Sequence, residues 1–182
     1  MASKSRGANK SKLPIMAMAV VIILVALVGV AWMYGKKEAS TMPPVSPTPL
    51  TIASVEQSLE AYRGNVVILD IWATWCGPCI KEIPDFIQLR EKYASQGFEI
   101  VGVSIDPIAQ QGGGAAAVAP FMKKYNINYP IWMINDAAAL GQYPMGQGIP
   151  TTYILDRNGK VVQKYIGARP MSVFENDIKA LL

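Results

Sequence analysis

The sequence predicts an α/β domain, and three observations lead to that prediction. Residues 66–72 form a near-continuous apolar run, the pattern of a central parallel strand that is covered on both faces. Residues 98–105 form a second run of the same kind, and a helix-like segment separates the two. Near the end of the chain, the turn signal Asn158-Gly159 joins two further strand-like runs into a hairpin.

The first residues indicate membrane topology. Residues 1–13 carry four basic residues and no acid, so they supply the whole net charge of +4. Residues 14–33 carry no charge, and about twenty apolar residues span a bilayer core. We therefore expect residues 14–34 to form a single-pass anchor, with a cytoplasmic basic tail and the rest of the chain extracytoplasmic. The alternative is a cleaved signal peptide. Charges balance elsewhere, so the basic character does not indicate a nucleic-acid partner.

Residues 35–50 read as a spacer between the anchor and the domain. Their second half is rich in proline and carries no charge, which is typical of an extended, semi-rigid linker. Simple disorder is the alternative. The globular domain then occupies residues 51–182, a normal size for one domain.

Within the domain we expect these elements in order: a helix at 54–62, a strand at 66–72, a helix at 77–94 with Pro84 inside it, a strand at 98–105, a loop at 110–117, a helix at 118–125, a strand at 129–134, a short helix at 137–143, a hairpin of 151–155 and 160–166, and a final helix. Helical spacing predicts that Ile80, Ile83, Ile87 and Ala94 form the buried face of the helix at 77–94. Ser172 and Glu175 form a capping box for the final helix.

The only two cysteines, Cys76 and Cys79, are separated by Gly77 and Pro78. Two sulfurs in the first turn of a helix form a small, reversible disulfide, and the helix N-terminus stabilises a thiolate there. We expect Cys76 to be exposed and to attack, and Cys79 to be more buried and to resolve. Gly77 permits close approach of another backbone, and Pro78 suits a first helical turn.

The cysteine pair has three other interpretations. A zinc site needs further ligands, but the chain has no second cysteine pair and no histidine. A structural disulfide closing so short a loop adds little stability. Two unpaired core cysteines remain an alternative.

One carboxylate interrupts the first apolar run, at Asp70. Burial raises the pKa of a carboxyl group, so Asp70 is expected to exchange a proton near neutral pH. A strand that ends just before the helix places Asp70 beneath Cys79, where it acts as general base toward the resolving thiol. The alternative is a strand-end Asp that caps a backbone group.

A family resemblance rests on eight residues: Asp70, Trp72, Trp75, Cys76, Gly77, Pro78, Cys79 and Pro84. With Ile149-Pro150-Thr151-Thr152, they resemble the thioredoxin superfamily and its membrane-anchored TlpA/ResA-like branch. The resemblance implies a central mixed sheet flanked by helices, with an extra strand–helix insert. It also implies a cis bond before Pro150 that faces the cysteines, where Ile149 pairs with an extended substrate; Trp75, Gly77 and Pro78 line the same surface.

Two positions need separate comment within this resemblance. Glu82 matches an acidic residue of the branch that modulates the cysteines, although a solvated helix residue is an equal alternative. Thioredoxins carry a lysine beside the buried Asp, and that position is Gly102 here.

The resemblance implies a reductase of protein disulfides, with apocytochrome c as the substrate of the branch. No cofactor is expected besides the cysteine pair itself. One span and one cysteine pair cannot carry electrons across a membrane, so a separate membrane thiol reductant is the expected donor. A disulfide-forming oxidase, a thiol peroxidase and a non-enzymatic adaptor remain the alternatives; Ala73, where a peroxidase normally has threonine, argues against the second.

Overall fold

The computed structural model describes residues 45–46, 48–109 and 111–182. The predicted basic tail, the anchor and most of the spacer lie outside these residues. Within the described part of the chain, no helix is long and apolar enough to cross a bilayer.

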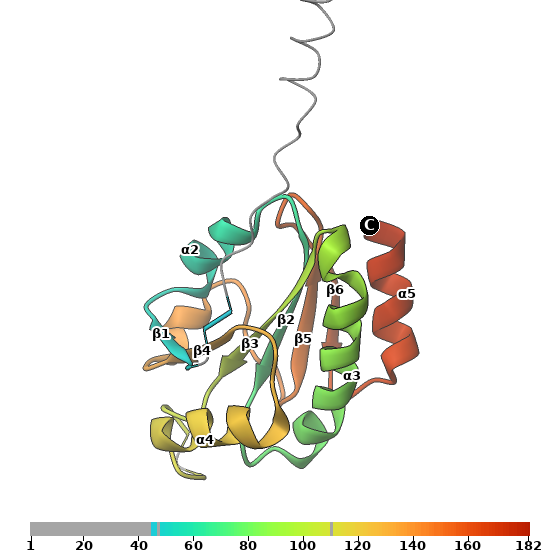
Figure 1. The fold of residues 1–182 in the computed structure, drawn as a ribbon. Helices are drawn as coiled ribbons and strands as arrows, with labels where there is room; N and C mark the ends of the chain where they lie inside the picture. The colour runs from blue at the N-terminus through green and yellow to red at the C-terminus, as the bar shows by residue number, and fades with distance from the viewer. Residues whose placement is uncertain (1–44, 47, 110) are drawn as a thin grey trace, which may run out of the picture. The chain divides into compact units, whose positions relative to one another are not determined.

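A six-stranded mixed sheet forms the centre of the domain, in the order β1-β4-β3-β2-β5-β6 (Figure 1). The strands are β1 (Leu50–Ile52), β2 (Val66–Trp72), β3 (Phe98–Ser104), β4 (Ile131–Ile134), β5 (Thr151–Leu155) and β6 (Val161–Ile166). The first four in spatial order are parallel, whereas β5 is antiparallel to β2 and β6 is antiparallel to β5. This confirms the predicted mixed sheet and its C-terminal hairpin.

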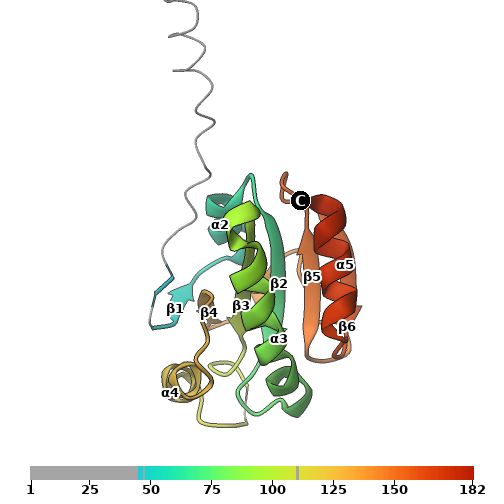
Figure 2. The ribbon, with the colours of Figure 1, turned by 45° about the vertical axis from the view of Figure 1, so that its right-hand side comes forward.

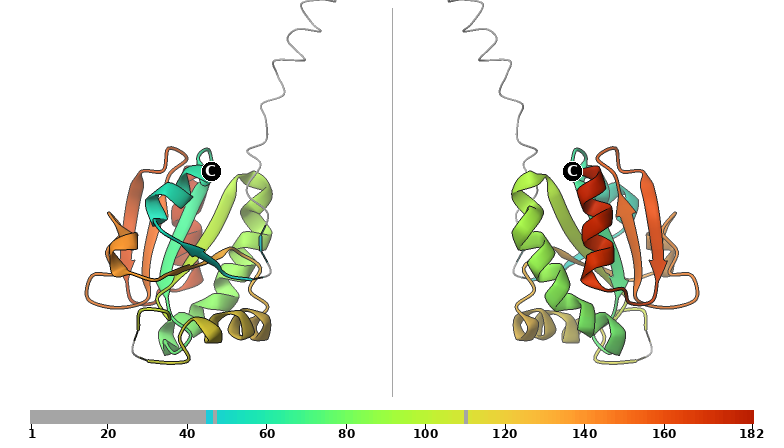
Figure 3. Two further views of the ribbon diagram at one scale, coloured as in Figure 1. Left: turned by 90° about the vertical axis from the view of Figure 1, so that its left-hand side faces the viewer. Right: turned by 90° about the vertical axis from the view of Figure 1, so that its right-hand side faces the viewer.

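The helices are α2 (Val55–Leu59), α3 (Gly77–Tyr93), α4 (Ala115–Tyr125) and α5 (Met171–Leu181), with short 3-10 turns η1 (Glu60–Tyr62), η2 (Ala94–Gln96) and η3 (Ala137–Leu140). Helices α3 and α5 lie side by side (Figure 2), where the rings of Phe86 and Phe174 are 5.3 Å apart. Both views of Figure 3 show α3 to one side of β5 and β6. On the other face of β5, the ring of Tyr153 contacts that of Tyr143.

The predicted insert is present. Helix α4 precedes β4, and β4 enters the sheet between β1 and β3. The ring of Phe121 on α4 contacts the ring of Trp72 on β2, with centroids 5.2 Å apart. Because Trp72 is the last residue of β2, the insert contacts the end of the sheet from which the cysteine turn begins.

The buried face of α3 differs from the predicted one. The buried residues are Cys79, Glu82, Ile83, Phe86, Leu89 and Tyr93. Ile80, Ile87 and Ala94 are only partly buried, so of the four predicted residues Ile83 alone was assigned correctly. The larger side chains Phe86, Leu89 and Tyr93 bury more apolar surface, and they follow the same helical spacing as Cys79.

Two further predictions, the start of α4 and the capping box of α5, were wrong. Helix α4 begins at Ala115 and not at Val118, because alanine is the best helix former and Gly114 supplies the break before it. The capping box is absent: α5 begins at Met171 after Pro170. The Glu175 carboxylate instead accepts hydrogen bonds from Lys92 Nζ and Tyr93 Oη, at 2.6 Å each.

Candidate active site

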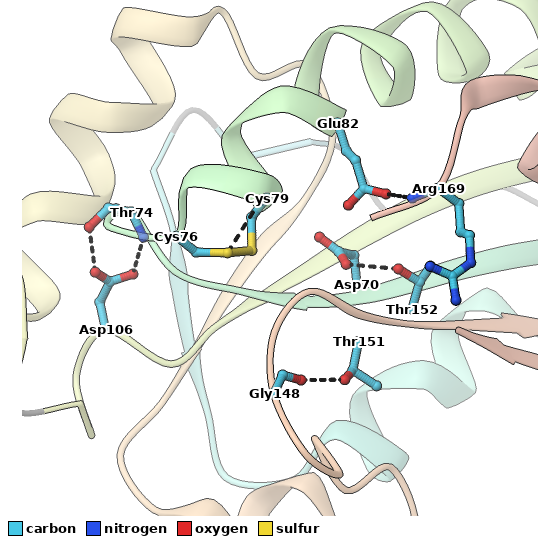
Figure 4. The surroundings of a disulfide bond; sticks show 10 residues. All are labelled: Asp70, Thr74, Cys76, Cys79, Glu82, Asp106, Gly148, Thr151, Thr152 and Arg169. Atoms are coloured by element: carbon cyan, nitrogen blue, oxygen red, sulfur yellow. Dashed lines mark hydrogen bonds between the residues drawn. A yellow bond between two sulfur atoms is a disulfide. The ribbon is translucent and has the colours of Figure 1, made fainter. Parts of the chain in front are cut away.

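The turn between β2 and α3 is fixed from the end of β3. The amide N–H of Cys76 donates to the carbonyl of Ala73 over 3.1 Å. Asp106, fully buried just after β3, accepts hydrogen bonds from both the amide N–H and the hydroxyl of Thr74. Figure 4 shows this pair directly before Cys76. The path of the chain into the first cysteine is therefore set by a neighbouring strand, through Asp106, which the sequence analysis missed.

Cys76 and Cys79 form a disulfide, with Cα atoms 5.3 Å apart. Cys76 is the N-cap of α3, and its Sγ accepts a hydrogen bond from the amide N–H of Cys79 over 3.2 Å. This confirms that both sulfurs lie in the first turn, where free N–H groups and the helix dipole stabilise negative charge on Cys76. The zinc and unpaired-cysteine interpretations do not describe this arrangement.

The predicted exposure of Cys76 was wrong. Cys76 is 5% exposed and Cys79 is 2% exposed, so only the order of the two is as predicted. Cys76 Sγ is bonded to Cys79 Sγ and accepts the Cys79 amide N–H, so it faces the first turn of α3. The exposed surface at this turn belongs to Gly77 and Pro78.

The residues beside the disulfide leave an open face. A Cβ at Gly77 would meet no atom of the described chain within 4 Å, so the backbone approach predicted there is not made within the chain. Pro78 lies in the first turn of α3, as predicted. Trp75 is half-buried, and a Cβ at Gly112 would lie 2.5 Å from Trp75 Cδ1. Trp75 is thus held on one side by the loop before α4, and Gly77 is open.

Asp70 lies in the interior, 5% exposed, on β2. Its Oδ1 accepts a hydrogen bond from the hydroxyl of Thr152 over 3.1 Å, and the two residues are register partners on β2 and β5. Burial, with a smaller contribution from the charge of Glu82, raises the pKa of Asp70 to about 8. In the view of Figure 4, Asp70 lies on the Cys79 side of the disulfide. The predicted burial of Asp70 and the upward direction of its pKa shift are confirmed, and its proton exchange with Cys79 stays a prediction.

Glu82 is a second buried carboxyl group, at 3% exposure, so the solvated-residue alternative was wrong. Its Oε1 accepts the amide N–H of Arg169 over 2.7 Å, and its buried Oε2 has no hydrogen-bond partner among the described residues. Burial raises the pKa of Glu82 to about 7. The charges of Asp70 and Glu82, after burial itself, also raise the pKa of Tyr129. The spacing of three from Cys79 is the signal that places Glu82 on the buried face.

The bond between Ile149 and Pro150 is cis, as predicted. Thr151 follows it and pairs with Ile71 in the β2–β5 register, so Pro150 lies at the end of the sheet from which the cysteine turn begins. The Thr151 hydroxyl is within hydrogen-bond distance of the carbonyls of Gly148, at 2.6 Å, and Met145, at 2.5 Å. Ile149 is half-buried. Thr151 thus anchors the loop before Pro150, and Thr152 bonds to the buried Asp70. In the sequence both were recognised only as part of a motif.

A CxxC disulfide at a helix N-terminus, on a thioredoxin-like α/β fold with a cis-proline at the same end of the sheet, defines a thiol-disulfide oxidoreductase. The AhpC/TSA family model matches residues 45–164. Thiol-disulfide oxidoreductase ResA of Geobacillus kaustophilus is 30% identical over 180 residues, 95% of this chain and 98% of that one. ResA of Bacillus cereus is 32% identical over 123 residues, 68% of this chain and 67% of that one.

Solved structures agree with these relatives. A candidate thiol:disulfide interchange protein DsbE from Chlorobium tepidum has 31% identity and a TM-score of 0.60, covering 68% of this chain and 84% of that one. A thioredoxin family protein from Chlorobium tepidum TLS has 30% identity and a TM-score of 0.59, covering 76% and 99%. The chain belongs to the AhpC/TSA family of thioredoxin-like proteins and, within it, is a TlpA/ResA-like thiol-disulfide oxidoreductase.

Proposed function

We propose that this oxidoreductase reduces protein disulfides on the extracytoplasmic side of a membrane. The Cys76 thiolate attacks a substrate disulfide, so one substrate sulfur leaves as a thiolate and the other forms a mixed disulfide with Cys76. Cys79 then gives its proton to Asp70 and attacks Cys76 Sγ. The mixed disulfide breaks, the second substrate thiolate leaves, and the Cys76–Cys79 disulfide forms. Two electrons pass to the substrate, and the protein is oxidised.

The observation that supports reduction over oxidation is the pair of buried carboxyl groups. Asp70 and Glu82 interact with each other electrostatically, and Figure 4 places both on the Cys79 side of the disulfide. When ionised, these carboxyl groups oppose ionisation of Cys79, whereas the helix N-terminus favours ionisation of Cys76. Strong oxidants owe their potential to a stabilised reduced form. The buried carboxyl groups, when ionised, destabilise the reduced form and so counteract the stabilisation that the helix N-terminus gives the Cys76 thiolate. We expect a potential near the thioredoxin value of about −270 mV and far below about −120 mV.

The anchor and the partners complete the proposal. Residues 14–34 are proposed to hold the domain at the cell membrane, with the N-terminus in the cytoplasm and residues 51–182 in the periplasm or at the outer face. A membrane thiol reductant is the proposed donor that re-reduces Cys76–Cys79. The disulfide of apocytochrome c, whose cysteines must be reduced before haem attachment, is the proposed substrate on the basis of the TlpA/ResA-like resemblance.

Two experiments test this proposal. Equilibration of the full chain with glutathione buffers gives the potential; a value near that of the strong oxidants would establish the oxidase alternative in its place. Cys79→Ser leaves Cys76 to trap substrates as mixed disulfides, which mass spectrometry identifies. The matched Cys76→Ser/Cys79→Ser double variant is the control for non-covalent capture.

Each outcome of the trap is informative. Capture of proteins with a haem-attachment cysteine pair supports the proposed substrate, and capture of other disulfide proteins replaces it. No covalent capture through Cys76 would favour the adaptor alternative. The AhpC/TSA match makes a peroxide assay worthwhile, and since Ala73 stands where a peroxidase normally has threonine, we expect no consumption of peroxide with a thiol donor.

A further inference from the structure

Among the residues that the structure describes, Thr152 is the one whose side chain hydrogen-bonds to the buried Asp70 carboxyl group. Thr152 Oγ1 donates to Asp70 Oδ1 over 3.1 Å, and Thr152 is fully buried. A hydroxyl without access to water needs a protein acceptor, and an ionised carboxylate is a stronger acceptor than a neutral one. The bond therefore both orients Asp70 and favours its ionised form.

Two adjacent threonines on β5 serve different parts of the site (Figure 4). Thr151 binds the carbonyls of the loop that precedes Pro150, whereas Thr152 binds Asp70 on β2. Successive side chains of a strand point to opposite faces, so one hydroxyl contacts the loop before Pro150 and the other contacts Asp70. We propose that Thr152 is a positioning residue for the resolving step, holding Asp70 ready to take the proton of Cys79.

The remaining neighbours of Asp70 do not supply this function. On α3, the facing titratable groups are Glu82 and Cys79; before β4, Tyr129 interacts with Asp70 electrostatically. All three are neutral or negatively charged, so none stabilises the Asp70 carboxylate by charge. The Arg169 amide donates to Glu82, and β3 presents Gly102, which has no side chain, as the register partner of Asp70.

This inference rests on the proposed role of Asp70, and the test separates the two. Reduced full-length protein is mixed with Ellman's reagent in a stopped-flow instrument. The first thionitrobenzoate is released when Cys76 attacks, and the second when Cys79 resolves the mixed disulfide. Because Asp70 must be ionised to accept the proton, the rate of the second phase rises with pH through an apparent midpoint.

Thr152→Val removes the hydroxyl while keeping the shape of the side chain. We expect the midpoint of the second phase to move upward by about one pH unit, and the rate below the midpoint to fall about tenfold, with the first phase unchanged. Thr152→Ser restores the hydroxyl and is expected to restore the midpoint. Thr151→Val, the same change one residue away, is expected to leave the midpoint in place. If Thr152→Val does not fold, the Thr152→Ala and Thr152→Ser pair gives the same comparison.

Asp70→Asn tests the underlying mechanism. A second phase that is slow in Asp70→Asn, with an unmoved midpoint in Thr152→Val, would overturn the role of Thr152 and leave that of Asp70 standing. A second phase that is unaffected in Asp70→Asn would overturn the proton route itself. Equal midpoint shifts in Thr151→Val and Thr152→Val would show a general effect of β5 and would also overturn the inference.

Discussion

Replacing Asp70 with asparagine is expected to stabilise the oxidised protein, by an amount that grows with pH. The pKa of Asp70 is raised from 3.8 to about 8 in the folded protein, mainly by burial. A folded-state pKa above the unfolded value means that the folded form holds the proton more tightly. The stabilisation from that proton is complete below about pH 4 and is lost as the pH rises through about 8. Asparagine keeps an acceptor for Thr152 and does not titrate.

The size of the effect follows from the shift. Each pKa unit corresponds to about 1.4 kcal/mol, so about four units give a difference of about 4 kcal/mol at pH 7 and about 6 kcal/mol above pH 8. Urea unfolding of the oxidised wild type and of Asp70→Asn, repeated between about pH 4 and pH 9, gives the difference curve. A curve that stays level between about pH 5 and pH 8 would refute a buried, proton-binding Asp70.

A control of opposite sign is available in Glu175. Its pKa is lowered to about 2, first by the hydrogen bond from Lys92, so its stabilisation is present above its ordinary value of 4.5 and is lost as the pH falls. Glu175→Gln should therefore change the curve only at the acid end and in the reverse direction. Agreement of both curves would tie each slope to its own carboxyl group.

Three other variants test neighbouring features. Glu82→Gln removes a buried negative charge and should make the Cys76–Cys79 potential less reducing, measured against glutathione; an unchanged or lower potential would contradict the charge argument. Gly102→Ala would bring a Cβ 2.6 Å from Ile131 Cδ1, so a loss of about 1–3 kcal/mol is expected in urea unfolding. The fully buried Glu99 accepts a hydrogen bond from Arg90 Nε over 2.6 Å. Arg90→Met removes this cation and should lower the free energy of unfolding by about 3–5 kcal/mol. A loss of less than about 1 kcal/mol would show that the pair contributes little.

Local patterns were sufficient to predict the first turn of α3 and every strand of the described sheet except β1, whose Leu50 was assigned to the linker. The apolar run of β2 was predicted at its observed bounds, Val66–Trp72, because a strand covered on both faces leaves little room for polar residues. Asp70 was predictable for the same reason, as the one charged residue in that run. The cis bond at Pro150 followed from the family resemblance, which depends on residues far apart in the chain.

Features that depend on tertiary contacts were not predictable in this way. Glu175 has the right spacing from Ser172 for a capping box, but Lys92 and Tyr93 on another helix offer its carboxylate better partners. The spacing of Glu82 from Cys79 indicates its buried face, but the donor that its carboxylate needs there comes from Arg169, far along the chain. The burial of Cys76 likewise depends on how the side chain turns, which spacing does not determine.

The residue opposite Asp70 explains why this site depends on hydrogen bonds and not on a salt bridge. Gly102 is the register partner of Asp70 on β3, and a Cβ there would lie 2.8 Å from Trp72 Nε1, so β3 has no space for a long basic side chain. Among the described residues, the Thr152 hydroxyl bonds to Asp70 and lowers its pKa, whereas the charge of Glu82 raises it. Transfer of the Cys79 proton to Asp70 then leaves the acid neutral while the thiolate is consumed in the new disulfide. Asp70 thus ends the resolving step in its neutral form, which is the form that low dielectric surroundings favour.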